Sequence, residues 1–131
     1  MPEISLTGHS GQTYKFNCYA PQTGWNAVPG CYAFITHAFV AGGGSDIRVH
    51  YIGQTDSFQR RMREHQDDKW ASAARDGANL VLALTEPNEA TRVAIEQDLI
   101  QALQPKLNAQ HAQPDRLAQR LQPPKNRLFG L

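Results

Sequence analysis

The sequence lacks several features that would define its class at once. It has only two cysteines, Cys18 and Cys31, which form neither a disulfide framework nor a zinc site and are expected to be reduced. No apolar run approaches the roughly 18 residues of a membrane span, so no membrane association is expected. Because no basic start leads into an apolar block, we expect no secretory signal and a cytoplasmic protein.

An excess of charge of one sign is also missing, since the 131 residues carry a formal net charge of +1. The charges are unevenly spread: residues 106–131 carry five Lys/Arg and one Asp/Glu, whereas residues 1–105 carry eight and eleven. The length suits one domain with its own core. The basic end could contact phosphates, but on charge alone a solvated terminus is favoured.

Hydrophobic patterning predicts four strands. Residues 13–19 alternate like a short strand, and the β-prone runs 31–40 and 47–52 flank the break AGGGSD, as in a β-hairpin. Residues 79–85 are a further β-prone run. We interpret the last three as strands of one small sheet.

Two helices are predicted around the last strand. Asp56 fits a capping-box start for a helix over roughly 57–66. Pro87 suits the start of a long helix that a proline ends after Gln104. Residues 67–77 are polar and indicate no single element. The predicted order is therefore β-β-α-β-α.

Two tyrosines lie on the strands of the predicted hairpin. Alternation places Ile47, Val49 and Tyr51 on one face of the second strand, which Gly53 is expected to end. Tyr32 lies on the first strand. Each tyrosine alone is more typical of a packed aromatic residue than of a catalyst.

An acidic residue interrupts the apolar face of the long helix. At about 100° per residue, Glu96 points into the apolar arc. Burying a carboxylate there costs several kcal/mol unless a divalent metal or an arginine meets it. The alternative to a metal site is a Glu–Arg pair with Arg92, on the same arc. The arc consists of Val93, Ile95, Leu99, Ile100 and Leu103.

Basic residues accompany the apolar side of the short helix. Arg61 and His65 lie four residues apart beside Phe58 and Met62, where they could bind one anion. The alternative is a snorkelling arginine and a half-buried histidine. Asn108, taken alone, is an ordinary loop or capping residue.

The order of these residues resembles that of the GIY-YIG nuclease family over roughly residues 28–108. Tyr51 precedes Arg61 by ten residues, Arg61 precedes His65 by four, and Glu96 precedes Asn108 by twelve. The motifs in order are Gly30-Cys31-Tyr32, Tyr51-Ile52-Gly53, Arg61, His65, Glu96 and Asn108.

The resemblance implies an α/β (α+β) fold with a small three-stranded antiparallel sheet flanked by helices. We expect an N-terminal extension over residues 1–27, a nuclease-like domain over 28–108 and a basic C-terminal tail over 109–131.

The resemblance also implies an endonuclease that hydrolyses DNA with one Mg²⁺ or Mn²⁺ ion. Glu96 would bind the ion, and Arg61 would stabilise the scissile phosphate. The residues expected around the attacking water are Tyr32, Tyr51 and His65, with Tyr32 as general base. Gly53 would let the backbone pack closely, and Asn108 would brace the site.

The sequence departs from the family pattern at three points. Cys31 stands where Ile or Val is common, the gap between the two tyrosines holds 18 residues, and Gln54 stands where many members have Lys. The last difference shifts the role of activating base toward His65. Candidate DNA contacts are Arg60 and, on a short helix predicted from Asp115 to Leu121, Arg116 and Arg120.

Two other hypotheses stay open. The chain could be a nucleic-acid-binding module of the same fold that has lost catalysis, or an unrelated α/β domain that binds a small anion or a protein. A nuclease is preferred, with DNA favoured over RNA as the substrate. So small a chain is expected to cut with little sequence preference, to act on branched or damaged structures, or to depend on a homodimer or a targeting partner.

Overall fold

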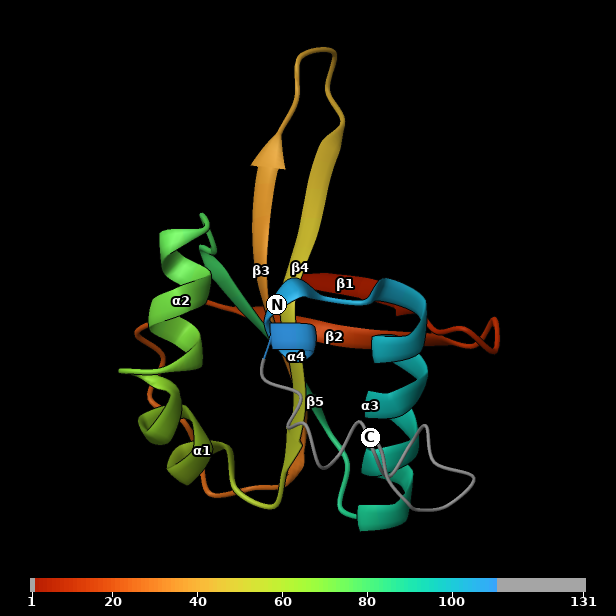
Figure 1. Ribbon diagram of the computed structural model, residues 1–131, viewed down its shortest axis with the longest axis vertical. Coiled ribbons are helices and arrows are strands. Elements are labelled where there is room, and N and C mark those ends of the chain that lie inside the picture. The colour runs from red at the N-terminus through yellow and green to blue at the C-terminus, as the bar shows by residue number, and fades with distance from the viewer. Residues whose placement is uncertain (1, 111–131) are drawn as a thin grey trace.

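The computed structural model describes residues 2–110 and contains one five-stranded sheet in the order β1-β2-β5-β3-β4 (Figure 1). Every pair of neighbouring strands is antiparallel. The strands are β1 (Glu3–Thr7), β2 (Thr13–Tyr19), β3 (Gly30–Phe39), β4 (Ser45–Thr55) and β5 (Leu80–Thr85).

The expectation of a three-stranded sheet is wrong, because the N-terminal residues add two strands. β2 pairs with β5, with Asn17 opposite Ala83, and β1 pairs in turn with β2. Both added strands contribute to the core, since Leu6 on β1 and Phe16 on β2 are buried. The apolar area that these side chains remove from water stabilises the hairpin on the sheet.

Four helices accompany the sheet in the described part of the chain: α1 (Phe58–His65), α2 (Lys69–Arg75), α3 (Glu89–Leu103) and α4 (Lys106–Gln110). The ambiguous stretch 67–77 thus forms α2. The helix predicted beyond Asp115 lies outside the described residues. None of the described helices is long and apolar enough to cross a membrane.

Side-chain caps fix the starts of α1 and α3. The expected capping by Asp56 is wrong: the Ser57 side chain accepts from the Arg60 backbone N–H, and the Asp56 carboxylate pairs with the Arg60 guanidinium instead. At α3 the Asn88 side chain accepts from the Thr91 N–H, satisfying a donor that a helix start leaves free.

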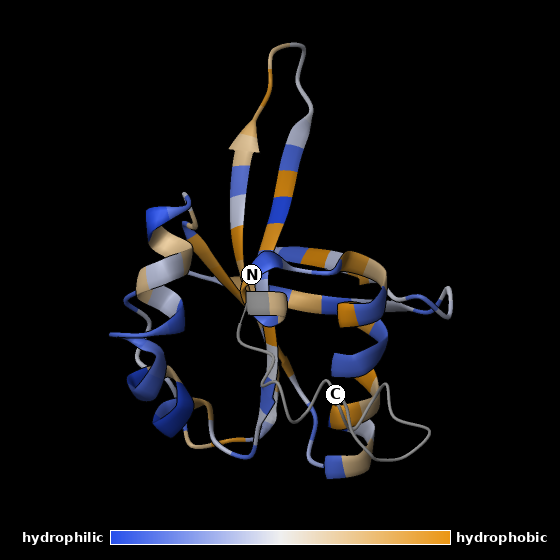
Figure 2. Ribbon diagram, viewed as in Figure 1, coloured by the Kyte–Doolittle hydropathy of each residue, from blue (hydrophilic) through white to orange (hydrophobic). Residues whose placement is uncertain are grey.

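The two faces of the sheet carry different cores. Helices α1 and α2 cover one face and α3 the other (Figure 1). In Figure 2 the strands are apolar where they cross the middle of the molecule, whereas α1 is largely hydrophilic. The core under α3 consists of Leu6, Phe16, Cys18, Cys31, Ala33, Ile35, Ile52, Leu82, Ile95 and Leu99. The core under α1 and α2 consists of Tyr32, Phe34, Tyr51, Phe58, Ala73, Val81, Ala83 and Leu107.

An irregularity in β4 changes which residues share a face. Tyr51 lies opposite Phe34, but Val49 lies opposite the next residue, Ile35, so His50 is an extra residue between the two pairs. The expectation that Val49 and Tyr51 share a face is therefore wrong: Val49 packs on the α3 core and Tyr51 belongs to the other core. β4 also continues past Gly53, which does not end the strand.

Candidate active site

A polar cleft of about 480 Å³ lies where the end of β4 passes between α1 and α3. Cationic side chains enter it from both helices, with Arg61 on α1 and Arg92 on α3. Its lining residues are Gln54, Thr55, Asp56, Arg60, Arg61, Glu64, Glu89 and Arg92. The cleft is open to solvent, and its lining carries three arginines and three carboxylates.

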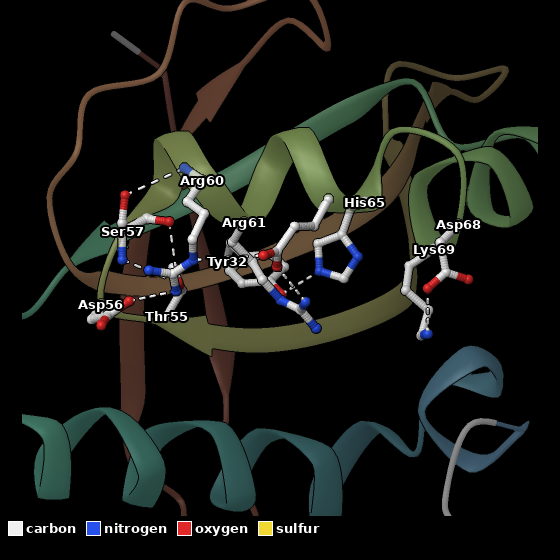
Figure 3. Close-up of polar contacts among 10 residues, drawn as sticks. Tyr32, Thr55, Asp56, Ser57, Arg60, Arg61, His65, Asp68 and Lys69 are labelled. Carbon is white, nitrogen blue, oxygen red and sulfur yellow. Dashed lines mark hydrogen bonds and ion pairs between the residues drawn. The ribbon is translucent and has the colours of Figure 1, made fainter.

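The buried partners of the cleft are Tyr32 and His65, each 1% exposed. The Tyr32 hydroxyl and His65 Nε2 are 2.5 Å apart and share one hydrogen bond. Figure 3 shows both side chains and Arg61 converging in the space between α1 and β4. The Tyr51 ring completes the group, with its centroid 6.2 Å from the Tyr32 ring and 5.3 Å from the imidazole.

Gly53 makes room for the Tyr32 ring. The two residues lie opposite each other on β3 and β4. A Cβ built on Gly53 would overlap the Cζ and hydroxyl oxygen of Tyr32. Any side chain here would displace the phenol, so this glycine is required for close packing rather than for an unusual backbone angle.

Burial keeps both members of the Tyr32–His65 pair neutral. It raises the pKa of Tyr32 strongly, Tyr51 and Glu96 add to the rise, and the charge of Arg61 opposes it. Burial also lowers the pKa of His65 to about 3, helped by the cations Arg61 and Lys69. A neutral imidazole keeps a lone pair on one ring nitrogen, so Nε2 can accept the hydrogen bond of the Tyr32 hydroxyl.

Arg61 is the cation nearest this pair. Its Nη1 lies 2.8 Å from Glu64 Oε1, in an ion pair whose two side chains are about one-third and one-half exposed. Burial disfavours the charged guanidinium, but the hydrogen bond with Glu64 and the proximity of Tyr32 outweigh this and raise the pKa of Arg61. The neighbouring Arg60 points away and pairs with Asp56 at 2.6 Å.

Glu96 approaches from α3. Its side chain is partly buried, and its negative charge raises the pKa of both Tyr32 and Cys31, so it lies within electrostatic reach of the phenol. The predicted arc holds in part: Ile95 and Leu99 are buried, whereas Leu103 is 38% exposed.

The acidic residues near the cleft are compatible with a divalent cation that takes few of its ligands from the protein. Residues 2–110 contain no group of three or more His, Cys, Asp or Glu that could hold a metal. Mg²⁺ commonly uses one or two protein carboxylates and takes its remaining ligands from water and substrate phosphate. A single carboxylate at Glu96 is compatible with that mode and with no closed, all-protein site.

Arg92 is the site residue whose role sequence analysis missed. It is only 5% exposed, and its Nε donates to Gln54 Oε1 at 3.0 Å. Its Nη1 donates to the carbonyls of Pro87 and Glu86 at 2.9 and 3.3 Å. The sequence feature that could have revealed it is its position on the buried side of α3. Its side chain holds Gln54 at the cleft.

Asn108 joins α4 to β4 directly beside the tyrosine motif. Its Oδ1 accepts from the Ile52 N–H and its Nδ2 donates to the Ile52 carbonyl, both at 2.8 Å. These two bonds fix the backbone between Tyr51 and Gly53. Arg116 and Arg120 lie outside the described residues.

The structure thus brings Tyr32, Tyr51, Arg61 and His65 together beside the acidic residue of α3. This is an α+β domain whose polar cleft has arginines in its lining and a buried tyrosine–histidine pair beside it. The family model of the GIY-YIG catalytic domain matches residues 29–108. The chain therefore belongs to the GIY-YIG family, which is of the nuclease type and implies a nucleic acid substrate. A search of curated proteins finds no match.

Proposed function

We propose that this protein is a divalent-metal-dependent endonuclease that hydrolyses phosphodiester bonds in DNA. The observation that carries the proposal is the buried hydrogen bond between Tyr32 and His65 beside the fixed cation of Arg61. An ionisable pair removed from water is expensive for folding, and such pairs are concentrated at catalytic sites.

Arg61 would bind the scissile phosphate. Its guanidinium already holds one carboxylate, Glu64, through an exposed contact of 2.8 Å. A phosphate can replace that carboxylate, because surface ion pairs contribute only about 0–1 kcal/mol. A guanidinium fixed at this place stabilises the negative charge that grows on the phosphoryl oxygens as the bond to the attacking oxygen forms.

Tyr32 and His65 would move the proton of the attacking water. As the water oxygen attacks phosphorus, its proton passes to the Tyr32 oxygen while the phenol proton passes to His65 Nε2. The bond from phosphorus to the leaving oxygen breaks, and solvent protonates the leaving oxygen. A phenol has a reference pKa of about 10, and burial raises that of Tyr32 further. The positive charges of Arg61 and of a bound metal ion would oppose this rise and favour the phenolate, and the imidazole at hydrogen-bond distance would receive the proton.

Glu96 would hold the metal ion, either Mg²⁺ or Mn²⁺. When bound, the ion supplies positive charge against the phosphate and lowers the barrier to charge build-up there. Two residues would position the tyrosines: Gly53 leaves room for the Tyr32 ring, and Asn108 fixes the backbone of β4 beside Tyr51. Gln54 lines the cleft, where its side chain is held by the hydrogen bond from Arg92.

The test is a cleavage assay on supercoiled plasmid and on labelled duplex, single-stranded and branched DNA and RNA, with Mg²⁺, Mn²⁺ or EDTA. We expect metal-dependent cleavage of DNA that EDTA abolishes. Glu96→Ala and Arg61→Ala should each lower the rate by at least about 100-fold without unfolding the protein. Exposed Glu3→Ala and Arg75→Ala are the matched controls and should cut normally.

Three results would each contradict a different part of the proposal. Cleavage by Glu96→Ala at the full rate would remove the metal-ligand assignment. Cleavage of RNA but not DNA would replace the substrate. Binding of DNA without cleavage of any substrate in either metal would identify a nucleic-acid-binding module that has lost catalysis.

A further inference from the structure

A second pocket, of about 500 Å³, lies on the opposite side of α1 from the candidate active site. Three aromatic side chains contribute to its walls: Trp25, Phe34 and Trp70. Its polar lining includes three residues of and just after α1: Gln59, Arg63 and Gln66. Tyr32 and His65 are not among the residues that line it.

Helix α1 turns one side to each pocket. Gln59, Arg63 and Gln66, spaced by four and three residues, line the aromatic pocket, whereas Arg60 and Arg61 line the catalytic cleft. The helix with its side chains is about 10 Å across. A nucleic acid strand covers that distance in roughly three nucleotides at 3.4 Å each, so one strand can occupy both places.

The aromatic walls are held in place before any ligand binds. Trp25 packs on Tyr19 and Phe58, with ring centroids 5.1 and 5.8 Å away. Trp70 packs edge-on against Phe34 at 5.2 Å. Both indoles stay partly exposed and line the pocket. A fixed aromatic surface loses little conformational entropy when a flat ring stacks on it.

We propose that this pocket binds an unpaired base of the nucleic acid strand that is cut on the other side of α1. The proposal rests on the proposed nuclease function and names its substrate class: DNA with single-stranded character near the scissile bond. An indole offers a stacking surface for any base. The amides of Gln59 and Gln66 each offer donors and an acceptor for a base edge, and Arg63 offers a cation for the adjoining phosphate.

The mixture of groups favours a base over a protein segment. An amphipathic helix or apolar peptide would be matched by an apolar rim, whereas this rim carries glutamines and an arginine. A base attached to a phosphodiester presents a flat apolar face, a hydrogen-bonding edge and a negative charge. Each finds a complementary group here.

The chain contains its own reporter for this pocket. It has two tryptophans, and both of them, Trp25 and Trp70, line the pocket. We would titrate the full-length protein in EDTA, where no cleavage occurs, with a twelve-nucleotide oligothymidylate. An abasic strand of equal length and charge and a blunt duplex are the comparison ligands. We expect tryptophan quenching by the thymidylate at a concentration at least about fivefold lower than for either comparison ligand.

Two variants separate base binding from folding. Trp70→Ala should weaken binding of the thymidylate by about 5- to 100-fold, read from the remaining Trp25, with thermal unfolding measured alongside. Gln66→Glu changes an exposed residue at the C-cap of α1, so its effect on folding should be small, within about 1 kcal/mol. Its negative charge at the rim should weaken binding severalfold. Gln101→Glu, the same change at an exposed position of α3, should bind normally.

Equal affinity for the abasic strand and the thymidylate, or normal binding by both pocket variants, would overturn the proposal. The nuclease function is scored separately by cleavage in Mg²⁺. A protein that cuts duplex DNA but shows no base-dependent quenching keeps that function and loses the pocket. A protein that shows base-dependent quenching but cuts no substrate loses the nuclease function and keeps the pocket as a site for unpaired bases.

Discussion

The two faces of the sheet differ in what they bury. Under α3 the core is mainly aliphatic, with one phenyl ring and two thiols. Under α1 and α2 it is aromatic, and the buried tyrosine–histidine hydrogen bond lies within it. A second, part-buried hydrogen bond joins Thr36 Oγ1 and His50 Nε2 at 2.6 Å. Buried polar groups contribute less to stability than apolar ones of the same size. We infer that the α3 face provides stability and the α1 face is specialised for chemistry.

The largest expected effect follows from removing one hydroxyl on the α1 face. Tyr32→Phe should lower the cleavage rate by about 10²- to 10⁴-fold, as loss of a general base does. It should also cost about 1–3 kcal/mol of stability, because the His65 imidazole loses its hydrogen-bond partner. Cleavage kinetics and urea unfolding measure the two effects.

A double variant separates the loss of activity from the loss of stability. In Tyr32→Phe with His65→Leu both partners are apolar, so much of the lost stability should return while activity stays low. A double variant no more stable than Tyr32→Phe would show that the α1 face does not sacrifice stability for its polar pair.

On the α3 face a truncation should act on stability alone. Leu82→Ala removes a fully buried side chain of β5 and should cost about 2–5 kcal/mol in urea unfolding. The cleavage rate per folded molecule should be unchanged. Leu103→Ala, at a position 38% exposed, is the matched control and should change stability by less than about 1 kcal/mol. A reduced rate in folded Leu82→Ala would break the proposed division between the faces.

Gly53→Ala tests the packing that positions the phenol. The added methyl group meets the Tyr32 ring and should cost about 1–3 kcal/mol, as overpacking does, and cleavage should fall with it. Gly24→Ala introduces the same group into open space and should be nearly neutral. Thermal unfolding and the plasmid assay compare the two. Normal cleavage by Gly53→Ala would mean that the ring tolerates displacement.

The smallest expected effect is the change of stability with pH between pH 7.5 and 5.5. His65 has a pKa of about 3 when folded and about 6.5 when unfolded, so protons bind the unfolded chain first. The free energy of unfolding should therefore fall as the pH drops from 6.5 toward 3, by at most about 1.4 kcal/mol per pH unit from this group. His50, whose pKa is lowered by burial and by Arg48, adds to the same slope.

The slope is best measured by urea unfolding between pH 7.5 and 5.5, where Asp and Glu side chains stay almost fully ionised. His65→Leu should flatten it. An equal slope in that variant would show that the imidazole is not responsible.

Much of the fold could be predicted because its signals are local. Strand 13–19 is confirmed by β2, and strands near 31–40 and 79–85 and helices near 57–66 and 87–104 are confirmed with small shifts at their ends. Turn residues, the alternation of apolar residues and the positions of prolines determine strands and helices from neighbouring residues alone. The convergence of Tyr32 with Arg61 and His65 was predicted from the family resemblance.

What could not be predicted depends on partners distant in the sequence. The bulge at His50 is a mismatch between two strands, and alternation within one strand cannot reveal it. β1 is five residues long and is defined by its pairing with β2. Asp56 and Ser57 are both good caps, so only the folded backbone decides between them. Arg92 could be placed on the core side of α3, but its bond to Gln54 joins residues 38 positions apart.

The side chain of Asn108 has a consequence beyond the site. β4 is an outer strand of the sheet, and such strands present unpaired N–H and C=O groups to which another chain can add. By donating to and accepting from Ile52, the Asn108 amide imitates a neighbouring strand for one residue. It thereby occupies the outer edge of β4 between Tyr51 and Gly53, where the strand of another copy would otherwise be able to add.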